Sequence, residues 1–420
     1  TLQDAWQQAA HGSPRLALIS GEAGIGKTRL SEELLAWVDR QGLPISTAYC
    51  YAAEGASAYA PVTTWLRGRP LAQLASPWRS EVARLLPDLS QGSVAPGPLT
   101  QAWQRQRFHE SLVHAMLGPD LALEQPLLLL LEDIQWCDAD TLAWLSYFLR
   151  YNARARLLVV STLRTEALSL DGPLPALLAD LRRHNLLVEI DLQPLDPTHT
   201  SRLAEAALGQ ALDAEAAARL YRETEGNPLF IVEFARAGLV QAATAADIHT
   251  AGLPPLVLAA VTSRLAQLSA PAQRLMNLAA VIGREFTFDI INRASQQDEE
   301  TIIEALDELW QHRIIRERGK RAYDFSHDKL RQVAYNRISP ARRQHLHQHV
   351  AQALAALNAG RPDPVSGQIG WHYQQAGENQ AAAEWLWKAG DYSARIGAYI
   401  EAVAYLKSAL SLLPTDDPRR

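Results

Sequence analysis

The stretch Gly21-Glu-Ala-Gly-Ile-Gly-Lys-Thr28 directly follows the apolar run Leu16-Ala-Leu-Ile-Ser20. An apolar strand, a glycine-rich turn, Lys-Thr and then a helix is the order in which a phosphate-binding loop occurs. The glycines let the backbone curl until successive N–H groups face one anion, and the helix expected over residues 29–40 presents the positive end of its dipole to the same charge. The sequence therefore predicts a nucleoside triphosphate site at this turn.

Two side chains of this loop have specific expected roles. Lys27 can reach the β- and γ-phosphates, and the Thr28 hydroxyl can hold Mg²⁺. The alternative is a glycine turn without a ligand, which the flanking strand and helix make less favoured. The predicted nucleotide contacts of this segment are Gly21, Gly24, Ile25, Gly26, Lys27, Thr28 and Arg29.

The composition is that of a globular protein with more than one core. The chain has 420 residues, of which 48% are hydrophobic and 20% charged, and this length exceeds one ordinary domain. A net charge of −6 gives no general attraction to nucleic acid. Cys50 and Cys137 form neither a disulfide framework nor a metal motif, and no apolar run can cross a membrane, so a cytoplasmic location without membrane contact is expected.

The first part of the chain alternates short apolar runs with helical patterns. Buried runs between helices are typical of a parallel sheet covered on both faces, so an α/β P-loop NTPase domain is predicted. A Pro/Gly-rich stretch at residues 86–98 is expected as a surface loop. The candidate strands are Leu16–Ser20, Ile45–Tyr51, Leu127–Glu132, Leu157–Leu163 and Leu186–Leu192.

From Asp196 onward the pattern is mostly helical. A basic turn at Arg318–Arg321 separates two short strand-like runs, as in the wing of a winged-helix domain, and small and aromatic residues between positions 382 and 414 follow a tetratricopeptide-like spacing. A stack of such repeats needs about three units, so the chain is interpreted as a piece of a longer protein. The expected units are a nucleotide-binding domain (1–195), a small helical domain (196–252), a winged-helix domain (253–338) and the start of a tetratricopeptide-like (TPR-like) array (339–420).

Two further strand ends carry candidate catalytic groups. The buried run from Leu127 ends in Glu132 and Asp133, where both carboxylates can approach Mg²⁺ or orient the attacking water. Which carboxylate has which role stays open. The next strand ends in Arg164, which points toward the ligand crevice of an open α/β sheet and can read a γ-phosphate.

Several blocks, in this order, resemble the STAND class of signalling P-loop NTPases, close to the AAA-like modules of large bacterial transcriptional regulators. The resemblance covers nearly the whole chain, and the second and fourth blocks are the most specific. The blocks are Gly-Glu-Ala-Gly-Ile-Gly-Lys-Thr-Arg-Leu (21–30), Leu-Glu-Asp-Ile-Gln-Trp-Cys-Asp (131–138), Val-Ser-Thr-Leu-Arg (160–164), Thr-Glu-Gly-Asn-Pro-Leu-Phe (224–230) and Phe-Ser-His-Asp-Lys-Leu (325–330).

The resemblance implies roles for two more residues. In that class the proline matching Pro228 packs near adenine, and the histidine matching His327 contacts the β-phosphate of ADP. From the sequence alone, Pro228 is a helix breaker and His327 a residue at a helix start. The class also has a Gly-Arg segment ahead of its first helix, which would precede Thr1. Base affinity and base specificity therefore do not follow from residues 1–420.

The leading functional hypothesis is an ATP/ADP-dependent switch in a transcription regulator. It would hydrolyse ATP slowly, self-associate when ATP is bound, receive an inducer at the helical repeats, and bind DNA through an effector domain outside these residues. One alternative is an energy-transducing AAA-type motor acting on protein or DNA. Another is direct nucleic-acid binding through the basic turn Arg318–Arg321 and through Arg342 and Arg343.

Overall fold

A computed structural model describes most of the chain, with gaps at several loops. The described residues are 1–50, 58–90, 97, 99–118, 125–151, 153–168, 172–236, 255–318, 322–360, 362–414 and 417. The stretch 86–98 lies mostly outside them, as do the predicted boundary at residues 252–254 and most of the basic turn 318–321. Among the described helices, none combines the length and the apolar character that crossing a membrane requires.

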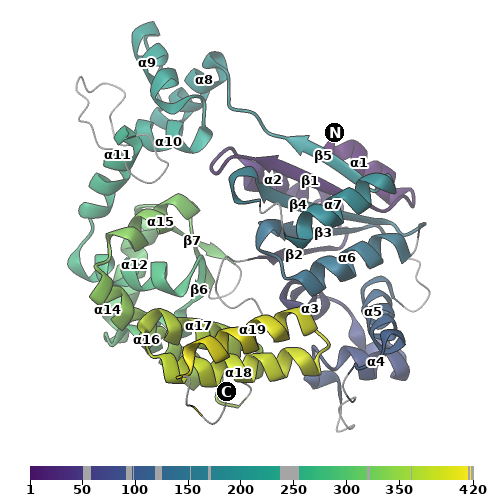
Figure 1. The fold of residues 1–420 in the computed structure, drawn as a ribbon. Coiled ribbons are helices and arrows are strands. Elements are labelled where there is room, and N and C mark those ends of the chain that lie inside the picture. The colour runs from purple at the N-terminus through teal and green to yellow at the C-terminus, as the bar shows by residue number, and fades with distance from the viewer. Residues whose placement is uncertain are drawn as a thin grey trace.

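The N-terminal domain contains a five-stranded parallel sheet, which confirms the predicted α/β class (Figure 1). The strand order is β2-β3-β4-β1-β5, so β1 and its phosphate-binding turn lie inside the sheet, next to β4. The predicted strands agree with the observed ones to within two residues at each end. The strands are β1 (Arg15–Gly21), β2 (Ile45–Tyr49), β3 (Leu127–Glu132), β4 (Leu157–Arg164) and β5 (Leu187–Asp191).

Helices cover both faces of this sheet because its central strands are apolar on both sides. Leu127, Leu129 and Leu131 of β3 face one layer, whereas Leu128 and Leu130 face the other, and all five are at most 1% exposed. The first layer contains α3 (Ala60–Arg67), α4 (Ser76–Val82), α5 (Ala102–Leu117), α6 (Ala139–Tyr151) and α7 (Pro173–Arg183). The second contains α1 (Leu2–Ala10) and α2 (Lys27–Asp39).

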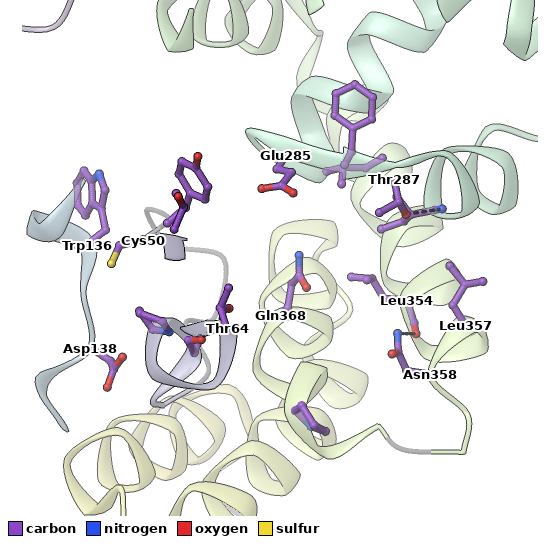
Figure 2. Close-up of a pocket in the computed structure, with 18 of the residues that line it drawn as sticks. Cys50, Thr64, Trp136, Asp138, Glu285, Thr287, Leu354, Leu357, Asn358 and Gln368 are labelled. Carbon is purple, nitrogen blue, oxygen red and sulfur yellow. Dashed lines mark hydrogen bonds between the residues drawn. The ribbon is translucent and has the colours of Figure 1, made fainter. Parts of the chain in front are cut away.

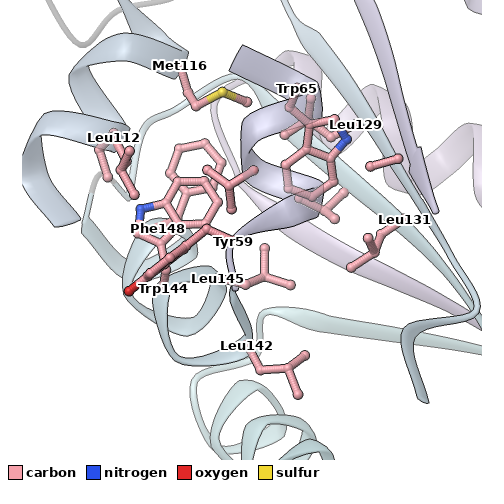
Figure 3. Packing of buried hydrophobic residues seen from close by; sticks show 14 of the residues in the cluster. Tyr59, Trp65, Leu112, Met116, Leu129, Leu131, Leu142, Trp144, Leu145 and Phe148 are labelled. Carbon is pink, nitrogen blue, oxygen red and sulfur yellow. The ribbon is translucent and has the colours of Figure 1, made fainter. Parts of the chain in front are cut away.

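The first layer is rich in aromatic side chains (Figure 3). Trp144 stacks on Phe148 with ring centroids 4.6 Å apart, and Tyr59 meets Phe108 edge to face at 5.4 Å. The Trp65 indole N–H donates to the carbonyl of Leu130 at 3.2 Å, which satisfies its one polar group inside the core. This packing holds the carboxyl end of β3 in a fixed position.

The middle of the chain forms two smaller helical units. The first contains α8 (Pro197–Leu208), α9 (Ala214–Thr224) and α10 (Pro228–Arg236). The second contains α11 (Pro255–Ala266), α12 (Ala270–Ile282), α13 (Phe288–Ser295), α14 (Glu299–Gln311) and α15 (Asp328–Arg337) with an antiparallel sheet. Its strands, in the order β6-β8-β7, are β6 (Glu285–Thr287), β7 (Ile315–Arg318) and β8 (Ala322–Phe325).

The sequence predicted two of these three antiparallel strands. The third, β6, is only three residues long, too short for an alternating pattern, so the two-stranded prediction was incomplete. The order of helices around the sheet agrees with a winged-helix arrangement, which stays a prediction.

The C-terminal helices return to the N-terminal domain. They are α16 (Pro340–Leu357), α17 (Ser366–Ala376), α18 (Asn379–Arg395) and α19 (Tyr399–Leu412). They pack in sequence order, and in Figure 1 α18 and α19 run below the sheet domain, near α3. Ile396 and Ala398, between α18 and α19, belong to the core of the sheet domain and are 2% and 0% exposed. The Tyr399 hydroxyl donates to the carbonyl of Leu99 at 2.7 Å.

Candidate nucleotide-binding site

The glycine-rich loop connects β1 to α2, as predicted. Its glycines Gly21, Gly24 and Gly26 have φ angles of 143°, 86° and 108°, which side chains other than hydrogen rarely allow. The Lys27 ammonium donates to the carbonyls of Gly21 and Glu22, both at 2.7 Å. Burial, aided by the Arg164 charge, lowers the pKa of Lys27 to about 8. The lysine side chain therefore links the end of the loop to its beginning.

Glu132 lies at the end of β3 and is 1% exposed. Its carboxylate accepts hydrogen bonds from the hydroxyls of Thr28 at 3.0 Å, Ser31 at 2.7 Å and Thr162 at 2.8 Å. Burial raises the pKa of Glu132, and the bonds from Ser31 and Thr162 oppose that rise. Glu132 thus links β3 to α2 and to β4, and its Oε2 accepts the hydrogen bond from the Thr28 hydroxyl.

Asp133 follows in a left-handed conformation, with φ of 57°. Arg164 binds it in a bidentate manner, donating from Nε at 2.9 Å and from Nη2 at 3.0 Å. Arg284 donates from Nη1 at 2.6 Å, and the Gln135 amide donates at 3.0 Å. Burial alone would raise the pKa of Asp133, but the two arginines outweigh it and lower that pKa.

Ion pairs join the sheet domain to the unit of residues 255–338 at this site. Arg164 also donates to Asp328 at 2.7 Å, at the start of α15. Arg316 of β7 contacts Glu32 of α2 at 3.1 Å. Arg164, Arg284 and Arg331 lower the pKa of Asp328 far below its usual range, although burial acts in the opposite direction. The site is therefore shared between two parts of the chain that are distant in sequence.

The start of α10 packs directly on the phosphate-binding loop. The Asn227 amide donates to the carbonyl of Ala23 at 3.1 Å, and the Leu229 N–H donates to the carbonyl of Gly24 at 3.3 Å. A Cβ at Gly24 would lie 2.7 Å from the Leu229 Cβ. Pro228 is half-buried at this contact and does not line the cavity described next.

A cavity of about 300 Å³ lies over the loop. Six cationic side chains and three carboxylates line it, together with His327, so it is suited to an anion. Burial lowers the pKa of His327 to about 4, which leaves the ring neutral at pH 7. The charged lining residues are Lys27, Arg29, Arg164, Arg284, Arg316, Lys329, Glu32, Asp133 and Asp328.

The structure brings most of the predicted site residues to this cavity. Those that line it are Gly24, Gly26, Lys27, Thr28, Arg29, Asp133, Arg164 and His327. Gly21, Ile25, Glu132 and Pro228 are not in its lining, although Glu132 bonds to Thr28 and Gly21 to Lys27.

Sequence reasoning missed Asn227, Leu229, Arg284, Arg316 and Asp328. Asn227 and Leu229 stand in the fourth block and Asp328 in the fifth, so a closer interpretation of those blocks could have found them. Arg284 and Arg316 stand in no motif, and only the folded chain places them at the site.

The residues present fit a nucleotide with Mg²⁺. Among the described residues no three His, Cys, Asp or Glu side chains form a metal cluster. Mg²⁺ in phosphate sites needs only one or two protein oxygens beside phosphate and water oxygens. The Thr28 hydroxyl and the Glu132 carboxylate, 3.0 Å apart, are such a pair. Gly26 has nothing within 4 Å of an added Cβ, so the space beside it is open to a ligand.

A larger cavity, of about 790 Å³, contains no residue of the phosphate-binding loop. Figure 2 shows its walls: Cys50, Thr64 and Trp136 from the sheet domain, Glu285 and Thr287 near β6, and further residues from α16 and α17. The cavity lies where three parts of the chain meet. The nucleotide prediction rests on the smaller cavity, because that one contains the loop.

Comparisons with known proteins agree with this geometry. Residues 1–160 match the family model of the AAA ATPase domain. An uncharacterised protein of Rhizobium meliloti is 28% identical over 455 aligned positions, which cover 98% of this chain and 42% of that protein. The chain therefore spans less than half the length of this curated relative.

Two solved structures are among those that match the chain. The crystal structure of a STAND protein with a tetratricopeptide repeat sensor from Pyrococcus horikoshii matches 98% of this chain and 58% of its own, with a TM-score of 0.51 and 12% identity. A Walker-type ATPase of Pyrococcus abyssi matches 79% of this chain and 94% of its own, with a TM-score of 0.34 and 12% identity. The phosphate-binding loop, the parallel sheet and the match over residues 1–160 together support a P-loop NTPase domain in the N-terminal part of the chain, similar to AAA ATPase domains.

Proposed function

We propose that the chain is an ATP/ADP-dependent signalling switch with slow ATP hydrolysis, the regulatory core of a larger transcriptional regulator. One observation carries this proposal: the cavity over the phosphate-binding loop is lined by both the sheet domain and the unit of residues 255–338. A nucleotide bound there contacts both parts. Whether the nucleotide is ATP or ADP then determines whether the two parts stay together. Such a dependence is what a switch requires.

The contacts suggest a division of roles between the two carboxylates. Glu132 lies against the Thr28 hydroxyl, so we assign these two side chains to Mg²⁺. Asp133 faces the cavity, so we assign it to the attacking water. Lys27 holds the β- and γ-phosphates, and Arg164 reports whether the γ-phosphate is present. The bound magnesium would supply charge neutralisation between the phosphates.

The remaining predicted contacts belong to the same proposal. Pro228 begins α10, whose next residue touches the loop at Gly24, and this contact supports the proposal that Pro228 packs near the adenine. His327 lines the cavity as a neutral ring, able to donate one hydrogen bond to the β-phosphate of ADP. Release of these contacts on exchange of ADP for ATP would free the unit of residues 255–338.

The outer parts of the chain complete the switch. We assign α12–α15 with β6–β8 to a winged-helix domain and α16–α19 to the start of a TPR-like array that receives an inducer. The ATP-bound form is proposed to self-associate, and DNA is proposed to be bound by an effector domain outside these residues.

The contacts do not favour direct nucleic-acid binding by the winged-helix unit. Helix α14, which would enter a groove in that arrangement, carries five carboxylates and no lysine or arginine. Arg318 is bound to Asp324 at 3.1 Å and covers the Tyr49 ring. Arg343 donates to two backbone carbonyls, those of Tyr335 and Ile338. These cations serve contacts within the chain.

The nucleotide content of the purified chain tests the proposal. The protein is denatured in acid and the released nucleotide identified, with Lys27→Ala alongside and Lys407→Ala, an exposed lysine on α19, as the matched control. We expect near-stoichiometric ADP in the wild type and the control, and a loss in Lys27→Ala. Equal nucleotide content in Lys27→Ala, or fast turnover without self-association, would contradict a switch. Turnover stimulated by a protein or DNA substrate would instead indicate an AAA-type motor.

A further inference from the structure

The two oxygens of the Asp133 carboxylate already accept four hydrogen bonds, which leaves no acceptor position for a water molecule. The donors are Nε and Nη2 of Arg164, Nη1 of Arg284 and the amide of Gln135, at 2.6 to 3.0 Å. Asp133 is 5% exposed. A carboxylate that orients an attacking water must accept that water's hydrogen bond. In this arrangement Asp133 cannot do so until a donor leaves.

Arg284 is the donor that comes from another part of the chain. It lies between the end of α12 and the start of β6, 151 positions from Asp133, and its side chain is 13% exposed. Arg164 and Gln135 belong to the sheet domain and can stay beside Asp133 in any relative position of the two parts. Separation of the parts therefore removes Arg284 from Asp133 and leaves Arg164 and Gln135 in place.

Arg284 also forms an ion pair within its own unit. Its Nε lies 3.5 Å from Oδ1 of Asp324 in β8. Arg316 and Arg318 contact that same carboxylate at 3.3 Å and 3.1 Å. Asp324 thus keeps two cations without Arg284. The closest contact of the Arg284 guanidinium is the one with Asp133.

We propose that Arg284 is a positioning residue that holds Asp133 away from the attacking water while the two parts are together, and that releases it when they separate. This inference rests on the proposed function, because it assigns Asp133 to the water. ATP hydrolysis then depends on separation of the two parts, because the unit of residues 255–338 supplies the arginine that inhibits it. This inhibition does not require contact between Arg284 and the phosphates.

The variants Arg284→Gln and Arg284→Lys test this role. The glutamine removes the charge, and the lysine keeps it at Asp133. We expect Arg284→Gln to raise ATP turnover roughly tenfold, the effect of about one pKa unit of lost interaction, and Arg284→Lys to stay near wild type. Arg274→Gln, an exposed arginine on α12, is the matched control. A turnover that falls or stays unchanged in Arg284→Gln overturns the proposal.

Rescue by the conservative variant provides a second readout, which a purely structural role would not give. The Arg284 side chain is 13% exposed, so a role in packing alone would be disturbed by both substitutions. Arg284→Lys keeps a cation within reach of Asp133, so we expect its turnover to stay low while that of Arg284→Gln rises. A turnover raised equally in both variants overturns the proposal.

A third measurement follows the shape of the chain without turnover. Small-angle scattering of the ADP-bound protein should give a larger radius of gyration for Arg284→Gln than for Arg274→Gln, with unchanged circular dichroism. An unchanged radius contradicts the closing role of Arg284. If Lys27→Ala loses nucleotide while Arg284→Gln resembles the wild type, the inference fails and the proposed function stands. If Lys27→Ala keeps its nucleotide, the proposed function itself fails.

Discussion

Gly24 shows how one residue of the phosphate-binding loop also belongs to a domain contact. Its φ is 86°, and the space where a side chain would begin is filled by Leu229 and Asn227 from the start of α10. The loop motif requires a glycine for the turn, but the structure adds a second reason, which is the close approach of the next domain. A methyl group at this position therefore disturbs both.

Gly24→Ala is expected to weaken nucleotide binding and to loosen α10. The added Cβ would lie 2.7 Å from Leu229 Cβ and 2.9 Å from Asn227 Oδ1, in addition to a backbone cost of about 1 kcal/mol for the left-handed conformation. Gly42→Ala, with φ of 70° and nothing within 4 Å of the Cβ, isolates the backbone cost. Thermal unfolding and equilibrium ADP binding of the two variants give the comparison. Equal losses of stability in both would show that the α10 contact contributes nothing.

Site residues could be predicted from the sequence where the chemistry is local. Lys27 and Thr28 stand in one loop, and Glu132, Asp133 and Arg164 end buried strands whose apolar runs mark their carboxyl ends. Arg284 could not be predicted in this way. It is one of 40 basic residues, 151 positions from Asp133, and its burial against that carboxylate exists only in the folded chain.

At the scale of elements, the contact between α6 and α19 is the one that sequence patterns least revealed. The Ala139 N–H donates to Glu401 at 2.9 Å. Asp140 Oδ2 and Glu401 Oε2 are both buried, and neither has a donor among the described residues. A proton shared between these carboxyl groups gives both a hydrogen bond. Burial, then Glu401, raises the pKa of Asp140 to about 9.

This contact is expected to open as the pH rises. The ordinary pKa of Asp140 is near 3.8, so the closed chain binds more protons than the open one between that value and about 9. The stabilisation is therefore complete below pH 3.8 and is lost as the pH rises through 9. Scattering or an intramolecular fluorescence distance between α6 and α19, followed from pH 7 to 10, should show this opening.

Glu401→Gln supplies the control for the pH experiment. Its amide can donate to Asp140 without a shared proton and can still accept from Ala139. Ionisable groups nearby are Asp138 on the same turn, Arg105 of α5 and the Tyr405 hydroxyl of α19. They are unchanged in the variant. An alkaline opening that persists unaltered in Glu401→Gln would show that the shared proton is not its cause.

The secondary structure was predictable where the patterns are long. Five sheet strands followed from apolar runs bounded by helices, and β3, with five leucines, was placed to the residue. Strand β6, with three residues, is too short to show the alternation of apolar and polar residues that indicates a strand. The pairing of α6 with α19 depends on a contact across 262 positions, for which one sequence contains no signal.

At the scale of the whole molecule, the chain turns back on itself. Figure 1 shows that the C-terminal helices α16–α19 lie below the N-terminal sheet. The closing contacts are those of Ile396, Ala398 and Tyr399 with the sheet domain. A change there affects a domain that ends about 200 residues earlier.

Ile396→Ala is expected to destabilise the sheet domain, although it lies between the C-terminal helices α18 and α19. The side chain is 2% exposed in the core of that domain, and its truncation should cost about 2–5 kcal/mol. Ile400→Ala, at a side chain that is 60% exposed, should change the free energy of unfolding by at most about 0.5 kcal/mol. Denaturant unfolding followed by tryptophan fluorescence compares them. Equal effects would mean that the closing contact is not part of the core.

The same contact sets an order of events during synthesis. The sheet domain leaves the ribosome with part of its core absent, because Ile396 and Ala398 are made roughly 200 residues later. At about 5–20 residues per second, that delay is on the order of 10 to 40 s. During this interval a nascent sheet domain exposes the apolar surface that the segment between α18 and α19 will cover. A chaperone or a nucleotide has that interval in which to reach the site before the chain closes over it.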